Sequence, residues 1–211
     1  VEITPSSFTR TNNSGFANED VNAWFDYVGV FTTGEAGDYI LTMTKDNNGE
    51  QRQIVMGNIS LVKAPEATAT MSISAAKYGT FIAPFDVEIP DGVTASKITG
   101  VDVNGVTLIE EAVEGTIPAN TPVLLYSETE VNEEFTAQSL ATQDTYTVGL
   151  LTGNLSGETI NAPMDSYILL NGANGVGFYR VVTEDVTVKN NRVYLTVPAA
   201  AEAKAFFSFG G

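Results

Sequence analysis

The chain has 211 residues, 43% of them apolar and 17% charged, which is enough for one large β domain or two smaller ones. Its 26 acidic and 10 basic residues give a formal net charge of −16, which disfavours nucleic acid and anionic lipid as partners. Histidine and cysteine are both absent, so thiol and histidine catalysis, disulfides and most zinc, copper and haem sites are excluded.

No apolar run approaches the ~20 residues that cross a bilayer, so the sequence predicts no membrane span in this chain. The acidic residues are spread along the chain and do not form one tail, which is typical of a surface that keeps a protein in solution. Weak cation binding is the alternative interpretation of the same acidity.

The N-terminal part contains four segments that are rich in β-branched and aromatic residues and bounded by Gly, Asp or Asn, as strands are. They are Trp24–Phe31, Tyr39–Thr44, Gln51–Val55 and Asn58–Val62. Asn48-Gly49 predicts a two-residue hairpin turn, because both residues accept a positive φ. Four strands are few for a closed core, so residues 1–64 are predicted to form a smaller β segment.

Residues 39–62 resemble the last strands of a jelly roll of the galactose-binding kind. On that resemblance, residues 1–64 are a partial jelly-roll-like segment. Two interpretations stay open for it: the chain is a fragment, or this segment packs against the second half.

Small residues dominate the stretch that follows. Residues 64–70 read Ala-Pro-Glu-Ala-Thr-Ala-Thr, with one proline and no large apolar side chain. A stretch of this composition cannot contribute much to a core, so residues 65–70 are predicted to be a linker.

Residues 71–211 contain seven short apolar strands closed by turn residues. They are Tyr78–Phe85, Ile117–Leu125, Tyr146–Leu151, Tyr167–Leu170, Gly177–Val182, Arg192–Pro198 and Lys204–Phe209. Turn signals recur every 10 to 20 residues, and no stretch shows a sustained helical period. The pattern predicts an all-β fold, an antiparallel β-sandwich over residues 71–211.

Two turns in this part bear on the register of the strands. Asn104-Gly105 predicts a two-residue hairpin in which Val101 lies opposite Leu108. Residues 171–175 predict another turn, but its two Asn-Gly pairs leave the register open.

Eight short segments of the second part carry a resemblance to a known family when taken in chain order. They are Ser74–Phe81, Pro84-Phe85, Ile89–Val93, Ile117–Leu125, Tyr146–Gly153, Val176–Tyr179, Arg192–Pro198 and Lys204–Phe207. Through these segments residues 72–209, about two thirds of the chain, resemble the C-terminal β domain of many secreted and surface proteins of Bacteroidetes. The resemblance implies export, and a place beside adhesion, glycan-binding or peptidase modules. It supplies no catalytic residue.

The best candidate ligand site is Trp24 with Asp26, because a flat ring stacks on a sugar while a carboxylate accepts hydrogen bonds from hydroxyls. The competing interpretation places one aromatic pair of residues 24–27 in the core. The run Asp46–Glu50 lacks the later Glu of a calcium loop and is interpreted as a turn, so no metal and no cofactor are expected.

Several glutamates follow one another closely enough to suggest the acid pair of a glycosidase. They are Glu110, Glu111, Glu114, Glu128, Glu130, Glu133 and Glu134. Such a pair needs two carboxylates held across a cleft, one with a raised pKa, whereas glutamates at strand ends are typically solvated.

The sequence therefore predicts a non-enzymatic β module, secreted or attached to the outer membrane at the cell surface, that acts in adhesion or as a scaffold. Its expected partners are surface or host glycans or other cell-surface proteins. The alternative is a carbohydrate-binding module of a glycan-degrading system. A hydrolase that uses carboxylates alone is a third possibility that the composition permits.

Overall fold

The computed structural model describes residues 7–10, 27–30, 65–102, 105–139, 143–198 and 204–209. The chain divides into two units, Val1–Val62 and Lys63–Gly211. In the first unit, β1 (Ser7–Arg10) pairs antiparallel with β2 (Tyr27–Val30), and β2 lies within the predicted strand at residues 24–31. The predicted hairpin at Asn48-Gly49 lies outside the described residues.

The described residues of the second unit form strands, turns and loops without a helix, so the all-β prediction is confirmed. The strands are β3 (Glu66–Ile73), β4 (Tyr78–Phe81), β5 (Val87–Glu88), β6 (Val93–Val101), β7 (Thr107–Val113), β8 (Thr116–Ile117), β9 (Val123–Ser127), β10 (Val131–Gln138), β11 (Thr145–Val148), β12 (Leu151–Asn154), β13 (Ile160–Asn161), β14 (Tyr167–Gly172), β15 (Gly175–Arg180), β16 (Thr187–Val188), β17 (Val193–Leu195) and β18 (Phe206–Phe209). In this part of the chain there is no helix long and apolar enough to cross a membrane.

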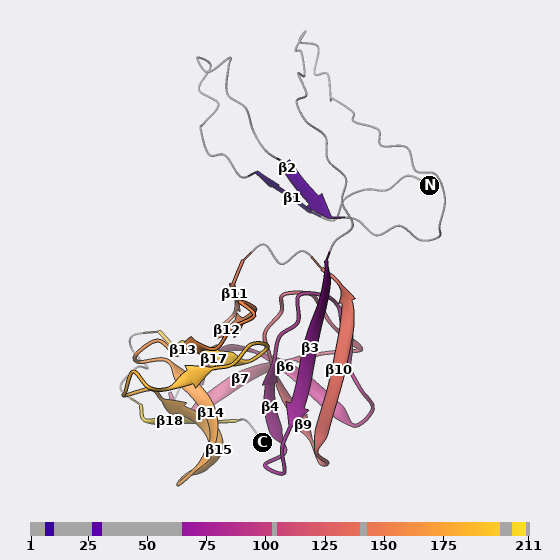
Figure 1. The fold of residues 1–211 in the computed structure, drawn as a ribbon. Coiled ribbons are helices and arrows are strands. Elements are labelled where there is room, and N and C mark those ends of the chain that lie inside the picture. The colour runs from indigo at the N-terminus through magenta and orange to yellow at the C-terminus, as the bar shows by residue number, and fades with distance from the viewer. Residues whose placement is uncertain are drawn as a thin grey trace, which may run out of the picture. The chain divides into compact units, whose positions relative to one another are not determined.

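Ten strands form one sheet in the order β11-β12-β17-β14-β15-β18-β7-β6-β9-β4 (Figure 1). Three two-stranded ribbons, β3–β10, β5–β8 and β13–β16, accompany it. Among the described strands the pairing is antiparallel except between β18 and β7, where Ser208 lies beside Thr107 in a parallel pair. This one parallel pair in an otherwise antiparallel set arises because β18 fills the gap between β15 and β7 and takes its direction from its antiparallel partner β15.

The predicted linker at residues 65–70 is wrong, because most of it belongs to β3. This strand pairs with β10 over its whole length, with Thr70 opposite Glu134. Its side chains alternate between the two faces, so Ala69 and Met71 are fully buried while their neighbours are not. Small residues contribute to the core here because a strand with one buried face needs an apolar residue only at every second position. Alanine is large enough for such a position where the side chains opposite it are large.

The predicted strand at residues 146–151 is two strands. Gly149 and Leu150 form the turn between β11 and β12, and Gly149 has a φ of +60°. The backbone N–H of Leu150 donates to the carbonyl oxygen of Ile98 at 2.8 Å, and a Cβ on Gly149 would collide with the same oxygen. The glycine therefore lets this turn dock against β6.

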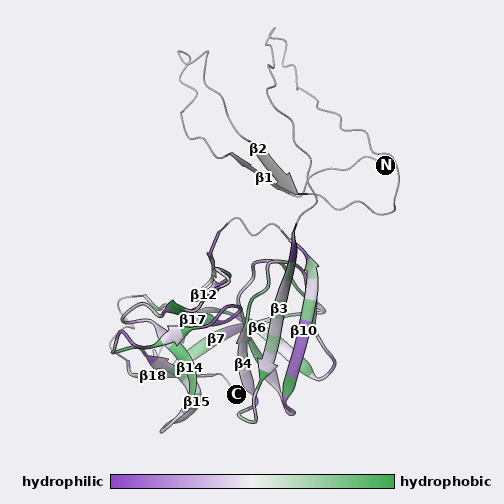
Figure 2. Ribbon diagram, viewed as in Figure 1, coloured by the Kyte–Doolittle hydropathy of each residue, from purple (hydrophilic) through white to green (hydrophobic). Residues whose placement is uncertain are grey.

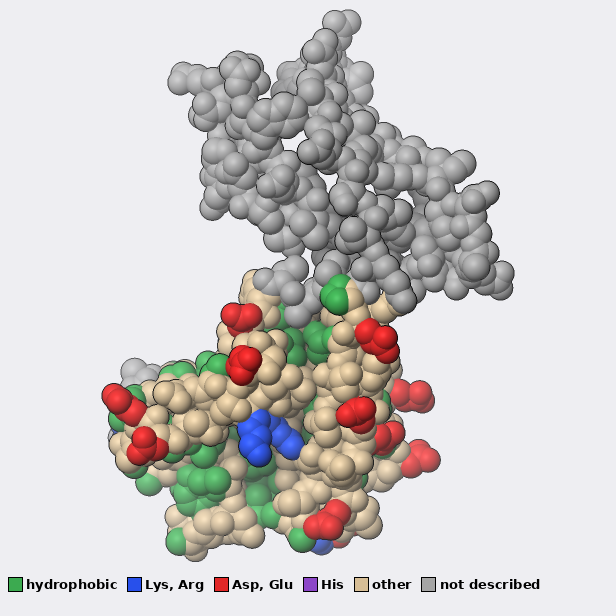
Figure 3. All heavy atoms as spheres, in the orientation of Figure 1, with side chains coloured by type: hydrophobic (Ala, Val, Ile, Leu, Met, Phe, Trp, Pro, Cys, Tyr) green, Lys and Arg blue, Asp and Glu red, His purple; other side chains and the backbone are tan. Residues whose placement is uncertain are grey.

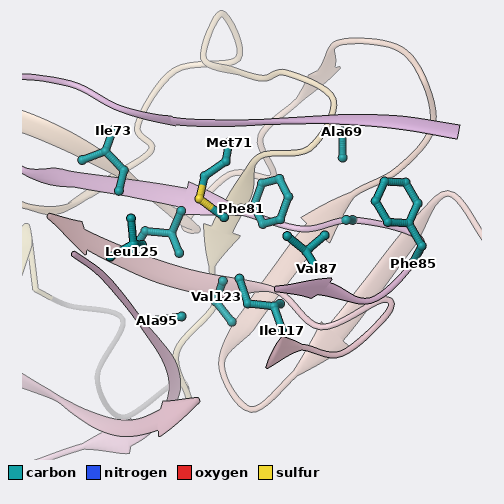
Figure 4. Packing of buried hydrophobic residues seen from close by; sticks show 12 residues of the cluster. Ala69, Met71, Ile73, Phe81, Phe85, Val87, Ala95, Ile117, Val123 and Leu125 are labelled. Atoms are coloured by element: carbon teal, nitrogen blue, oxygen red, sulfur yellow. The ribbon is translucent and has the colours of Figure 1, made fainter. Parts of the chain in front are cut away.

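β9 is buried on both faces and separates two hydrophobic clusters. Val123 and Leu125 lie in the first cluster, which the β3–β10 ribbon covers with Met71 and other side chains (Figure 4). Leu124 points the opposite way, into the second cluster. A strand with this pattern reads as one continuous apolar run, since neither face meets water.

The second cluster shows that the large sheet curls back on itself. Leu108 of β7 and Leu124 of β9 pack in the same cluster as Tyr167 of β14 and Leu195 of β17. The facing layers that the sequence predicted as a sandwich are thus mostly two halves of one sheet. Figure 2 shows that the apolar residues concentrate in its strands.

The segment that starts β17 joins the two halves of the curl by hydrogen bonds. Arg192 donates from Nη1 to the carbonyl oxygens of Ser72 (3.1 Å) and Thr80 (2.9 Å), and Asn191 donates from Nδ2 to that of Ile82 (3.0 Å). The backbone N–H of Ile82 returns a bond to the carbonyl of Asn191 at 3.3 Å. Burial lowers the pKa of Arg192, although a guanidinium stays charged.

Replacing Arg192 with Met should destabilise the protein by about 3 kcal/mol, because two carbonyls lose a charged donor. Arg192→Lys should recover part of this loss, since an ammonium also donates hydrogen bonds but lacks the planar arrangement of several N–H donors that a guanidinium has. Urea unfolding of the two variants and the wild type measures the difference. Equal stability of the Met variant and the wild type would contradict a structural role for this side chain.

The edge strand β10 carries one charged residue, Glu133, on the face that it turns towards the first cluster. Val131, Phe135 and Ala137 pack against the first cluster, and Glu133 shares their face, opposite the buried Met71. A charge at such a position discourages a second strand from pairing with the edge. Acidic side chains also line the side of the unit formed by β3 and β10 in Figure 3.

We expect Glu133→Val to promote self-association through this edge. Glu134→Val, one residue further on the other face, is the matched control and should stay closer to wild type. Sedimentation over a range of concentrations measures the outcome. If both variants sediment like the wild type, Glu133 does not protect the edge.

Candidate functional site

The predicted ligand residues Trp24 and Asp26 lie outside the described residues, as does the acidic run at residues 46–50. The glutamates that the sequence singled out are all exposed and lie on β7, on β10 or in the turns that follow β7 and β9: Glu110, Glu111, Glu114, Glu128, Glu130, Glu133 and Glu134. In the part of the chain that the structure describes, no three acidic residues gather closely enough to hold a metal ion.

An aromatic group bridges the curl of the sheet at the start of β4. The ring of Tyr78 stacks on Phe209 of β18, with centroids 4.4 Å apart and planes at 29°. On β9, the ring of Tyr126 lies 5.0 Å from that of Tyr78, tilted by 55°. The three rings come from distant parts of the sequence and meet because β4 and β18 face one another inside the curl.

Charged side chains complete this group, which we call the Tyr78 cluster: Lys77, Tyr78, Tyr126, Glu128 and Phe209. Nζ of Lys77 donates to Oε2 of Glu128 at 2.5 Å, and the hydroxyl of Tyr126 donates to Oε1 of the same carboxylate. Lys77 has a φ of +67°, in a turn closed by a bond from its N–H to Ser74. The turn geometry thus places the ammonium beside β9.

The hydrogen bonds set the protonation states of the cluster. The bond from Lys77, and then that from Tyr126, lower the pKa of Glu128. The same bonds raise the pKa of Lys77 and of Tyr126. Glu128 is therefore an ionised acceptor near neutral pH, which is the wrong state for a general acid.

Two of the glutamates that the sequence singled out share a neighbour in this cluster. The pKa of Tyr78 is raised mainly by burial, and then by the negative charges of Glu110 and Glu128. Glu110 lies on β7 and Glu128 follows β9, with β6 between these strands. The curl of the sheet brings both charges towards one ring, which sequence spacing does not reveal.

A second feature is a stretch of the large sheet that neither neighbouring ribbon covers. The β3–β10 ribbon covers the face formed by β4, β9 and β6, while Ile160 and Val188 of β13 and β16 pack with Ile168 of β14. Between these two covers, Ile109 and Leu170 are 47% and 46% exposed. Figure 3 shows hydrophobic side chains reaching the surface of this unit.

Two aromatic rings pack against glycines in the same stretch. The ring of Phe206 lies over Gly177, and that of Tyr179 lies over Gly172, where a Cβ would come within 2.6 Å of Tyr179 Cζ. The two ring centroids are 4.8 Å apart. Glycine in a strand often marks such a close approach, and this is the signal in the sequence that could have located the surface.

Two hydrogen bonds hold the hydroxyl of Tyr179. Its hydroxyl donates to the carbonyl of Gly175 at 2.8 Å and accepts from the N–H of Asn174 at 2.9 Å. We call Ile109, Leu170, Tyr179 and Phe206 the open face. Its side chains are mostly apolar and lie on the outer face of the curled sheet, so this surface suits contact with another macromolecule better than enclosure of a small molecule.

Comparisons of the chain with models of known families, with curated proteins and with solved structures give no match in any of the three.

Removing the ammonium of Lys77 should raise the pKa of Glu128. In the folded protein this pKa lies below the ordinary value of about 4.3, so the stabilising bond is present above that pH and is lost as pH falls through the folded pKa. A carboxyl NMR titration of wild type and Lys77→Met measures the change, with Lys97→Met as the control. An unchanged titration of Glu128 would contradict the proposed coupling.

Proposed function

We propose that this chain is a non-enzymatic β module of an exported protein, secreted or attached at the cell surface, and that it acts in adhesion or as a scaffold in a larger assembly. The open face is the observation that carries the proposal. Contiguous exposed apolar side chains on a soluble domain typically mark a contact surface, and aromatic residues are enriched at the core of such surfaces.

The geometry of the open face favours a protein partner. Its four side chains are aliphatic or aromatic, and the one hydroxyl among them, on Tyr179, already donates to a backbone carbonyl. Such a surface gains from the exclusion of water by another apolar surface. Two rings held over glycines lose little side-chain entropy on contact, because they are ordered beforehand.

The electrostatics of the Tyr78 cluster support the non-enzymatic part of the proposal. Glycoside hydrolysis needs one carboxylic acid whose pKa is raised so that it donates a proton near neutral pH. The pKa of Glu128 moves in the opposite direction. The carboxylate hydrolase that the composition permits is therefore the less favoured alternative at this place.

Localisation and partners follow from the sequence alone and stay predictions. The resemblance of residues 72–209 to the Bacteroidetes surface domain supports export and attachment at the outer membrane. Cell-surface proteins are the partners that fit the open face. The alternative, a carbohydrate-binding module acting through Trp24 and Asp26, also stays a prediction.

Binding of the full chain to intact bacterial and epithelial cells tests the proposal. Leu170→Glu should weaken retention by about tenfold or more, because a charge would be buried against the partner. Val182→Glu is the control, since Val182 is 68% exposed and lies outside the open face. Protease treatment of the cells should abolish the part of the binding that depends on Leu170, and thermal unfolding should be alike for all three proteins.

Equal retention of wild type and Leu170→Glu, or a difference between them that survives the protease, would contradict a protein contact at the open face. Release of reducing sugar from polysaccharides by the purified chain would contradict the non-enzymatic assignment.

A further inference from the structure

Tyr126 is the outermost ring of the Tyr78 cluster. Tyr78 is enclosed between Phe209 on one side and Tyr126 on the other, so it serves to close the curled sheet. Tyr126 is not itself enclosed in this way: it is half-buried, and its strand neighbours across the sheet are Tyr78 on β4 and the exposed Thr94 on β6. Its ring thus keeps a side that is available to a ligand.

The polar groups around Tyr126 are fixed before any ligand arrives. Glu128 accepts bonds from both Lys77 and Tyr126, which hold its carboxylate next to the ring. Each carboxylate oxygen can accept a further bond, and the ammonium of Lys77 can donate more than one. The site therefore offers an ordered aromatic surface with an acceptor and a donor at its rim, as ligand sites typically do.

From this arrangement we propose that Tyr126, with Glu128 and Lys77, binds one neutral sugar residue of a glycan. The apolar C–H face of a pyranose packs on the aromatic ring, and two adjacent hydroxyls reach the rim. One hydroxyl donates to the Glu128 carboxylate, and the other accepts from the Lys77 ammonium. Charge-assisted hydrogen bonds of this kind are short and directional, so they select the hydroxyl arrangement of the sugar.

Charge determines which glycans fit. Glu110 and Glu128 both act on Tyr78 from nearby, while Lys77 compensates one of the two. The chain as a whole carries −16. Sialylated, sulfated and uronic-acid glycans are therefore repelled, and neutral hexoses and N-acetylhexosamines are accepted.

This site is separate from the open face. Tyr126 lies on β9 on the same face as Leu124 of the second cluster, whereas Leu170 and Phe206 lie on the outer side of β14 and β18. A glycan at Tyr126 and a protein at the open face can therefore be tested independently. Failure of one leaves the other standing.

An array that carries neutral, sialylated and sulfated oligosaccharides tests the proposal with the full chain. Wild type should bind neutral hexose or N-acetylhexosamine glycans, and Tyr126→Ala should lose about tenfold or more in affinity for them. Tyr126→Trp should retain binding, because it keeps the aromatic face. Tyr146→Ala on β11 is the control and should bind as wild type does, and thermal unfolding identifies any variant that is not folded.

Glu128→Gln provides a second measurement that does not remove the ring. It keeps the shape of the side chain but removes the charge from the hydrogen bond, so affinity should fall while the preference for neutral glycans relaxes. Wild-type binding confined to anionic glycans would overturn the proposal. So would unchanged binding by folded Tyr126→Ala, or displacement of the glycan by choline, which would indicate a cation site.

Discussion

The contact between residues 191–193 and the β3–β4 region is the constraint on which the second unit depends. Arg192 and Asn191 bond to carbonyls of Ser72, Thr80 and Ile82, and the N–H of Val193 donates to the hydroxyl of Thr80 at 3.2 Å. These bonds join β17 to β4, the last strand of the same sheet. They turn an open, ten-stranded ribbon into a curl with an enclosed core, and they also bring β3 against β4.

The curl places the two faces of the sheet in different surroundings. The concave face holds the second cluster and ends at the Tyr78–Phe209 stack, which places Tyr126 and Glu128 at the surface. The convex face is covered by the β3–β10 ribbon at one end and by β13 and β16 near the other. The two short covers leave the middle of the convex face uncovered, and this is where the open face lies.

The open face lies where a local rule of strand composition is broken. Glycines at 172 and 177 weaken strands in general, yet here they let Tyr179 and Phe206 lie against the backbone. Departures of this kind are expected at functional sites, because the local cost must be offset by something else in the molecule. At Glu133 we expect the departure to protect an edge.

The sequence by itself determined the elements whose geometry is local. The predicted pairing of Val101 with Leu108 is observed, because a short hairpin turn sets the register of the strands that it joins. At residues 171–175 the turn was predicted but its register was not; in the structure Gly172 pairs with Gly175, and the ring of Tyr179 packs against Gly172. Tertiary structure alone decided that β3 is a strand, that the sheet curls, and that Glu110 and Glu128 approach Tyr78. These outcomes depend on contacts between residues distant in sequence, which no local pattern encodes.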